Sequence, residues 1–399
     1  MKKLSVRDCD LKGKRVLLRA DYNVPMDEHG NITAFMRIEE SIPTIKYILE
    51  QGASLVILTH LGRPQGQRVS AMSVKPVAHV LEECFDIKVI FADDPLAEET
   101  VALCQGLQPG EIVLCENLRF YPEEEANDDD FARKLARLGD LYVNECFSVD
   151  HRSHASTVGI PQYLPTYIGL LLEKEINALS KVLENPDRPL VAIIGGAKVS
   201  DKIKILAKLL PIVDKLIIGG GMANTFLAAK GYDMQKSLVE EAKIDFAKEL
   251  LNGAYADKIY LPVDVRAASE FSNDAVIKVV PVATVPQDYQ CLDIGEKTVA
   301  IFAAALADAK TILWNGPMGV FEMSHFAAGT KDIAKIVGDA DAYSVIGGGD
   351  SAAAVRSIGM EKGISHISTG GGASLKFLEG KELPGIAACL DKVETVGKD

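Results

Sequence analysis

Short apolar segments of the kind that form β-strands alternate with amphipathic stretches of helical period along nearly all of this chain. In the first half, the strand patterns lie at residues 15–20, 54–59, 88–91, 112–115 and 141–144, and the helical patterns at 36–51, 74–85 and 128–138. This alternation is typical of right-handed crossovers between parallel strands. It predicts a parallel sheet that is covered by helices on both faces.

The alternation changes near the middle of the chain. Residues 166–184 read as one long helix, which Pro186 and Pro189 bring to an end. A second alternating series follows, with strands expected near residues 190–194, 215–218, 258–261, 311–314, 342–346 and 365–368. The predicted fold class is therefore α/β, with two doubly wound, parallel-sheet (Rossmann-like) domains joined by an interdomain helix and a cleft between them.

The length of 399 residues suits two or three domains. We place an N-terminal α/β domain at residues 1–170, the interdomain helix at 171–185 and a C-terminal α/β domain at 186–379.

Composition excludes several classes of protein. Hydrophobic residues make up 48% of the chain and charged residues 25%, which is the mixture of an ordered globular protein. The net charge of −13 disfavours a partner such as nucleic acid or an anionic membrane. A small anionic ligand remains compatible with this charge if cations are gathered locally.

The cysteines and the apolar runs indicate the compartment. The seven cysteines form an odd set without a CxxC spacing, which favours reduced thiols over a disulfide framework or a zinc ribbon. No secretory signal is visible, and the longest apolar run, residues 299–307, has half the length needed to span a bilayer. We expect a cytoplasmic protein.

In open parallel sheets, ligands bind at the carboxyl ends of the strands. The first-half residues that follow predicted strands, or open the first long helix, are Asp21, Asn23, Arg37, His60, Arg63, Asn117, Arg119 and Arg152. Arginine offers a bidentate fork to phosphate or carboxylate, although an arginine in a loop is more often plain surface charge. The position of Arg63 in a tight turn favours binding.

Glycine clusters follow the strands of the second half instead, at residues 195–196, 219–221, 347–349 and 370–372. A glycine turn that enters a helix presents backbone N–H groups to a phosphate. A single cluster is more often only a tight turn, but four in one half favour a nucleotide. Neither a GxxxxGK[ST] loop nor a dinucleotide-binding GxGxxG is present.

Three charged residues accompany these turns. Lys198 and Lys202 are four residues apart, which places both on one face at the start of a helix, either as an anion site or as a solvated surface. Asp350 follows the third cluster and suits Mg²⁺, with a helix N-cap as the alternative. His151 and His154 lack the spacing and the supporting ligands of a zinc site.

The motifs now resemble a known family. Residues 19–25 carry the R-x-D-x-N-x-P pattern of phosphoglycerate kinases, and the resemblance continues through residues 60–64, 116–120, 195–202, 219–223, 314–319, 347–351 and 370–374. These motifs occur in the family's order over nearly the whole chain. The resemblance implies reversible phosphoryl transfer from 1,3-bisphosphoglycerate to ADP, giving ATP and 3-phosphoglycerate, by a Mg²⁺-dependent monomer whose domains close.

The resemblance also implies roles for single residues. The triose would be held in the N-terminal domain by Asp21, Asn23, Arg37, His60, Arg63, Arg119 and Arg152. The nucleotide would be bound in the C-terminal domain by Lys198, Lys202, Gly220, Asn315, Glu322, Gly348, Gly349, Asp350 and Ser351, with Asp350 on the Mg²⁺. The transferring group would be stabilised by Arg37, Lys198, Gly371 and Gly372. The C-terminal tail, about residues 380–399, would pack back on the N-terminal domain.

One stretch departs from the family pattern. Where the family usually has D-A-F-G-T-A, residues 145–150 read E-C-F-S-V-D. If Asp150 faces the pocket, its carboxylate competes for Arg152 and weakens triose binding; if it faces solvent, little changes. The assignment of Arg152 therefore depends on where this side chain points.

Two other functions remain open from the residues alone. A nicotinamide-dependent dehydrogenase also has two α/β domains with glycine turns, but the missing dinucleotide motif counts against it. A non-catalytic nucleotide-binding or scaffold protein is the third hypothesis. It would have no use for transition-state cations such as Arg37 and Lys198.

Overall fold

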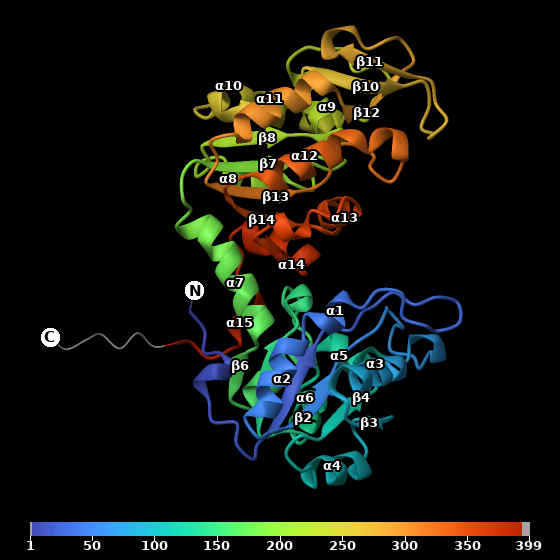
Figure 1. Ribbon diagram of the computed structural model, residues 1–399, viewed down its shortest axis with the longest axis vertical. Helices are drawn as coiled ribbons and strands as arrows, with labels where there is room; N and C mark the ends of the chain where they lie inside the picture. The colour runs from blue at the N-terminus through green and yellow to red at the C-terminus, as the bar shows by residue number, and fades with distance from the viewer. Residues whose placement is uncertain (1, 393–399) are drawn as a thin grey trace, which may run out of the picture. The chain divides into compact units, whose positions relative to one another are not determined.

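The structure is a computed structural model and describes residues 2–392. Its contacts divide the chain into two units (Figure 1). The first unit runs to Asn177 and takes up the chain again from Glu382, and the second unit is Ala178–Lys381. The division falls within helix α7 (Leu170–Glu184). Residues 393–399 of the expected tail lie outside the described residues.

The first unit is built on a six-stranded parallel sheet in the order β3-β4-β2-β1-β5-β6. Its strands are β1 (Arg15–Ala20), β2 (Ser54–Leu58), β3 (Val89–Ala92), β4 (Ile112–Cys115), β5 (Leu141–Glu145) and β6 (Thr166–Ile168). Every residue of β2, β4 and β5 is buried. Burial on both faces explains why these strands appear in the sequence as short, nearly continuous apolar runs.

Helices cover both faces of this sheet. One face packs against α2 (Ile42–Glu50) and α3 (Lys75–Phe85), and the other against α4 (Glu98–Gln105) and α6 (Asp129–Ala136). The side chains of β1 alternate between the two cores, with Leu18 in the first and Leu17 in the second. The alternation follows from the two-residue period of a strand. Short helices α1 (Met36–Glu39), α5 (Pro122–Ala126) and α15 (Pro384–Ala387) complete the unit.

The second unit contains another six-stranded parallel sheet, in the order β15-β14-β13-β7-β8-β9. Its strands are β7 (Leu190–Ile194), β8 (Lys215–Ile218), β9 (Ile259–Tyr260), β13 (Thr311–Asn315), β14 (Tyr343–Gly347) and β15 (His366–Ile367). Its helices are α8 (Ile203–Leu209), α9 (Gly220–Ala229), α10 (Ile244–Asn252), α11 (Glu296–Leu306), α12 (Ala328–Asp339), α13 (Gly349–Ser357) and α14 (Gly371–Leu378). The two parallel sheets confirm the predicted α/β class.

The second unit also holds a small sheet that the sequence analysis did not predict. Strands β10 (Asp264–Ala268), β11 (Ile277–Pro281) and β12 (Gln290–Ile294) pair antiparallel in the order β11-β10-β12. Strand β11 is apolar in sequence, but its residues are exposed or only partly buried, and it lies at the edge of this sheet beside β10.

The prediction of one helix over residues 166–184 is wrong at its start. Thr166–Ile168 form β6, whose residue Thr166 pairs with Tyr142 of β5, and the helix begins only at Leu170. The buried carboxylate of Glu145 accepts hydrogen bonds from the backbone N–H groups of Leu171 and Leu172, both at 3.0 Å. An acid at this position satisfies N–H groups of the first turn, which have no partner inside the helix.

No helix of the described residues is both long and apolar enough to cross a membrane.

Helix α6 provides a test of the core. Leu135 is fully buried against the first sheet. We expect Leu135→Ala to lower the free energy of unfolding by about 2–5 kcal/mol, because it removes apolar contacts and leaves a cavity. Urea denaturation measures this change. Lys134→Ala, on the half-exposed side of the same helix, should cost less than about 1 kcal/mol; equal losses in the two variants would contradict the packing described.

Candidate active site

A cavity of about 280 Å³ lies where β1, β2, β4 and β5 end. Its lining is Asp21, Asn23, Arg37, His60, Gly62, Arg63, Arg119, Ser148, Val149, His151 and Arg152. All the residues expected to hold the triose are therefore brought together in one pocket. The sequence analysis did not single out Gly62, Ser148 or Val149 as lining residues, because their contribution depends on how two loops fold over the sheet edge.

Polar contacts organise one wall of this pocket. The Asp21 carboxylate forms an ion pair with Arg37 and accepts a hydrogen bond from the Ser148 hydroxyl. The guanidinium of Arg37 also donates to the Ser148 Oγ, at 3.5 Å. On the neighbouring loop, Asn23 accepts the Gly62 N–H at 2.8 Å, which ties the end of β1 to the turn after β2.

His60 lies beneath the pocket, 2% exposed. Its Nδ1 is 3.1 Å from Nη2 of the buried Arg19. Because arginine can only donate, Nδ1 accepts and the ring proton sits on Nε2. Burial, together with the charges of Arg19 and Arg119, holds the pKa of His60 well below its usual value. The ring is therefore neutral at pH 7.

Besides Arg37, three arginines supply positive charge to the pocket. The nearly buried Arg119 donates to the Gly62 carbonyl at 2.8 Å, and burial and the neighbouring charge of Arg19 lower its pKa to about 10. It therefore remains charged at pH 7. In the part of the chain that the structure describes, no ion pair engages the guanidinium of Arg63 or Arg152. Both cations are available to an anion.

Asp150 points neither into the pocket nor to solvent. Its side chain is fully buried, and Oδ1 accepts a hydrogen bond from Nδ2 of Asn144 at 2.8 Å. It forms no ion pair with Arg152. Both orientations considered from the sequence are therefore wrong, because that reasoning did not anticipate that the turn folds this carboxylate back into the protein.

The second unit has a cavity of about 400 Å³ at the carboxyl ends of its own strands. It is lined by Gly196, Ala197, Gly220, Gly221, Asn224, Leu238, Phe271, Gln290, Cys291, Leu292, Pro317, Gly319, Val320, Glu322 and Asp350. Of the expected nucleotide residues, the lining contains Gly220, Glu322 and Asp350. Two apolar members, Ala197 and Pro317, belong to motifs, and the others come from the small antiparallel sheet and from loops that carried no motif.

Three glycine turns form one edge of this cavity through backbone hydrogen bonds. The N–H of Gly196 donates to Pro317 at 3.1 Å, and that of Gly220 donates to Met318 at 3.0 Å. Gly220 has a φ of +68°, and a Cβ there would lie 2.6 Å from the Gly196 carbonyl oxygen. Only glycine fits this position.

Lys202 and Asn315 meet beside these turns. The Lys202 ammonium donates to the side-chain oxygen of Asn315, while burial lowers the pKa of Lys202. The amide nitrogen of Asn315 is buried and has no hydrogen-bond partner among the described residues. An unpaired buried donor is costly unless a ligand supplies the acceptor.

The expectation that Lys198 and Lys202 share a helical face is wrong. Helix α8 begins only at Ile203, and both lysines lie in the loop before it. Ser200 holds this loop, since its N–H and hydroxyl donate to the Glu240 carboxylate at 3.0 and 2.6 Å. Because both lysines precede the helix, their four-residue spacing does not place their side chains on one face.

Two helices start close to the remaining expected residues. Gly348, with a φ of +92°, precedes α13, whose first turn contains Gly349, Asp350 and Ser351. Asp350 is exposed and does not cap the helix, so the N-cap alternative is excluded. Gly371 and Gly372 form the first turn of α14. Helix starts of this kind present N–H groups and the positive end of the helix dipole to phosphates.

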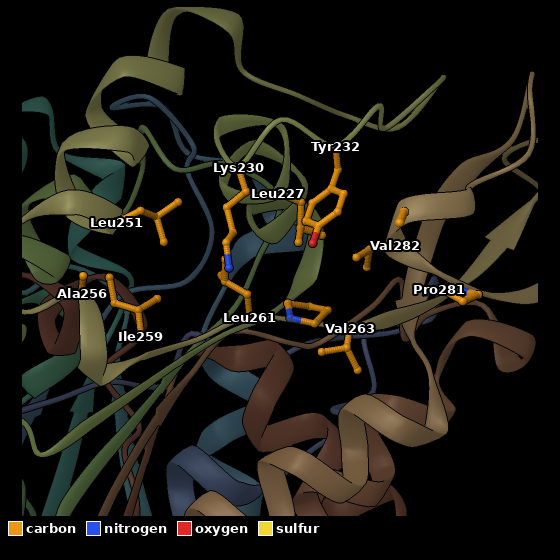
Figure 2. A pocket seen from close by; sticks show the side chains of 12 residues that line it. Leu227, Lys230, Tyr232, Leu251, Ala256, Ile259, Leu261, Val263, Pro281 and Val282 are labelled. Atoms are coloured by element: carbon orange, nitrogen blue, oxygen red, sulfur yellow. The ribbon is translucent and has the colours of Figure 1, made fainter.

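A third cavity, of about 330 Å³, lies in the second unit around the end of α9 and contains none of the expected residues (Figure 2). Lys230 and Tyr232 are the side chains with polar tips in an otherwise mostly apolar lining.

Comparison with known proteins decides the family. The model of the family described as "Phosphoglycerate kinase" matches residues 6–381. The chain belongs to the phosphoglycerate kinase family. It is therefore a phosphotransferase.

Relatives and solved structures agree over the whole length. The phosphoglycerate kinase of Moorella thermoacetica is 52% identical over 394 residues, which are 98% of this chain and 100% of the relative. That of Chlorobium phaeobacteroides is 52% identical over 397 residues, again 98% of this chain and all of the relative. Among solved structures, phosphoglycerate kinase from Coxiella burnetii has a TM-score of 0.88 and 43% identity, covering 97% of this chain and 98% of its own. The enzyme from Pyrococcus horikoshii has a TM-score of 0.83 and 34% identity, covering 96% and 98%.

The environment of His60 makes a prediction about its titration. Because burial and neighbouring guanidinium groups lower its pKa, the ring should stay neutral from about pH 6 to 8, where an ordinary histidine titrates. Its NMR resonances, assigned by their loss in His60→Asn, should not shift over this range. A titration midpoint near about 6.5 would show that the ring is not buried beside Arg19.

Proposed function

We propose that this chain catalyses the reversible transfer of a phosphoryl group from 1,3-bisphosphoglycerate to ADP, giving ATP and 3-phosphoglycerate, in glycolysis and gluconeogenesis. The observation that carries the proposal is the first-unit pocket. It gathers four arginines in a chain whose net charge is −13. The missing dinucleotide motif counts against a dehydrogenase, and family membership supports a kinase over a non-catalytic binder.

In this proposal the first unit is the triose-binding domain. Arg63 and Arg152, whose guanidinium groups have no ion pair within residues 2–392, receive the phosphate of the triose, together with Arg119 and the neutral His60. Asp21 and Asn23 accept or orient its hydroxyl group, since both have oxygen atoms at the pocket. Arg37 faces the carboxyl end of the substrate, where transfer takes place.

The second unit is the nucleotide-binding domain. In this proposal the phosphates are bound at the start of α13 by the backbone amides of Gly348 and Gly349 and by the Ser351 hydroxyl. Gly220, whose N–H donates to Met318, lets the backbone approach the nucleotide closely. Lys198, Lys202 and Glu322 complete the polar contacts. The unpaired amide nitrogen of Asn315 supports a ligand with an acceptor at this position.

The residues present fit Mg²⁺ bound with the nucleotide. Among the described residues, no group of three or more His, Cys, Asp or Glu side chains is placed to hold a metal. A single exposed carboxylate, Asp350, is what Mg²⁺ uses when phosphate oxygens and water supply its other ligands. When bound, the ion neutralises charge on the phosphate oxygens.

The chemistry explains why the candidate site has no acid–base pair. The acceptor in the ATP-consuming direction is a carboxylate, which is already ionised at pH 7 because its pKa is about 4. What remains is in-line positioning and stabilisation of a loose, anionic transition state. Arg37, Lys198 and the amides of Gly371 and Gly372 are the groups that we assign to this task.

The proposed reaction uses arginines of one unit and lysines of the other on the same transferring group, so in this proposal the domains close over the substrates. We therefore infer a hinge that includes α7, in a cytoplasmic monomer whose partners are its small-molecule substrates. Closure would also exclude water and suppress hydrolysis of ATP.

A coupled assay with ATP, Mg²⁺ and 3-phosphoglycerate tests the function. We expect turnover in the unmodified chain and a fall in kcat of about 10²–10³-fold in Lys198→Ala, the size of losing one preorganised charge at the transition state. Lys204→Ala, at an exposed position in α8, is the matched control and should keep its activity. A folded chain without turnover, or an unaffected Lys198→Ala, would refute the assignment.

Closure predicts a change in solution scattering. The radius of gyration should decrease when nucleotide and triose are bound together, and less with either ligand alone. Superimposable profiles of the free protein and the ternary complex would exclude the closure mechanism.

A further inference from the structure

Asp150 belongs to the stretch in which this chain departs from its family. Its side chain is fully buried and is anchored on β5 through the 2.8 Å hydrogen bond from Asn144. Its backbone carbonyl accepts the N–H of Gly385 at 3.0 Å. Asp150 is thus joined by its side chain to the central sheet and by its main chain to α15, far along the sequence.

The surroundings are shaped to this carboxylate. Asn144 donates from the same Nδ2 to the Gly385 carbonyl, at 3.2 Å, so one amide bridges the strand, the turn and α15. A Cβ at residue 385 would lie 2.2 Å from Oδ1 of Asp150. A glycine at 385 is therefore what makes room for the aspartate at 150.

The turn that Asp150 anchors forms part of the triose pocket. Ser148, Val149, His151 and Arg152 all line that pocket, on either side of Asp150 in the sequence. The N–H of Arg152 donates to the Val149 carbonyl at 2.9 Å, so the turn is tight. Because no ion pair in the described residues holds the Arg152 guanidinium, its position depends on the backbone that carries it.

We propose that Asp150 is a positioning residue for triose binding, which fastens the turn bearing Ser148 and Arg152 to β5 and α15. It does not touch the substrate. This inference rests on the proposed function and assigns to the unusual Cys146–Asp150 stretch a role in substrate affinity. Alanine, the residue that the family usually has here, could not accept the hydrogen bond from Asn144.

The acceptor oxygen, not the negative charge, is the part of Asp150 that this role needs. Burial raises the pKa of Asp150 to about 6, against the opposing effects of the Asn144 hydrogen bond and the Arg19 charge. Its second oxygen, Oδ2, is buried without a hydrogen-bond partner. An asparagine keeps the acceptor and the size of the side chain, so it is a conservative substitute.

Three variants test the proposal by steady-state kinetics and by calorimetric titration with 3-phosphoglycerate. Asp150→Ala should raise the KM and the Kd for 3-phosphoglycerate about fivefold or more, with kcat and the KM for ATP within about twofold of the unmodified chain. Asp150→Asn should restore both constants to within about twofold. Asp140→Ala, which removes the ion pair with Arg15 before β5 begins, is the control and should leave triose affinity unchanged.

Gly385→Ala tests the same contact by a substitution in α15. Its methyl group would displace the carboxylate, so triose affinity should fall as in Asp150→Ala, and the two effects should not add in the double variant. This second route keeps the test decisive if Asp150→Ala does not fold.

The outcomes separate this inference from the function on which it rests. Unchanged triose affinity in folded Asp150→Ala or Gly385→Ala refutes the positioning role, as does an Asp150→Asn variant as weak as Asp150→Ala. An unmodified chain that binds 3-phosphoglycerate without turnover refutes the proposed function, while the calorimetric comparison still decides the role of Asp150. A chain that does not bind 3-phosphoglycerate refutes both.

Discussion

All carboxyl ends of a parallel sheet meet at one edge, and both candidate pockets depend on this constraint. In the first unit, β1, β2, β4 and β5 deliver Asp21, His60, Arg119 and Arg152 to one cavity from positions up to 131 residues apart in sequence, the separation of Asp21 from Arg152. In the second unit, the same geometry brings glycine turns together. The helices that cover the faces of each sheet leave this edge free, so polar groups gather there, some exposed like Arg63 and some buried beneath the pocket like His60.

A buried arginine lies under the arginines that line the first pocket. Arg19 is completely buried, and Ser156 bridges it to the buried carboxylate of Glu124, accepting from Arg19 Nε at 2.8 Å and donating to Glu124 at 2.5 Å. A buried charge is tolerated only when it is paired and hydrogen-bonded in this way. Burial, together with this guanidinium, keeps the pKa of His60 well below its usual value, and the guanidinium also orients the ring. In an acidic chain, this arrangement concentrates positive potential where an anion would bind.

The sequence predicted those parts of the fold that local patterns determine. The parallel strands and their end residues were located because buried strands are short apolar runs and because ligand positions follow them directly. Strand β6 was missed because Thr166–Ile168 become a strand only by pairing with β5, which lies more than 20 residues earlier. The Lys198 loop was read as a helix because its spacing fits one, whereas the hydrogen bonds from Ser200 to Glu240 that hold it as a loop come from a distant segment. Similarly, nothing local in the sequence shows that Asp150 turns inward, since its partners are Asn144 on β5 and Gly385 near the end of the chain.

The two pockets also differ in how they can change during evolution. The first pocket is built from side chains, so a new residue in a supporting turn can adjust it, as Ser148 does by bonding Asp21. The edge of the second cavity is built from the backbone. Gly220 and Gly348 have positive φ angles, and a Cβ would lie 2.6 Å from the Gly196 carbonyl oxygen at the first and 3.3 Å from the Asn315 amide at the second. A side chain at either position would strain the chain or crowd the group that binds a ligand. The departure from the family pattern at residues 145–150 lies in the first unit, where the pocket depends on side chains.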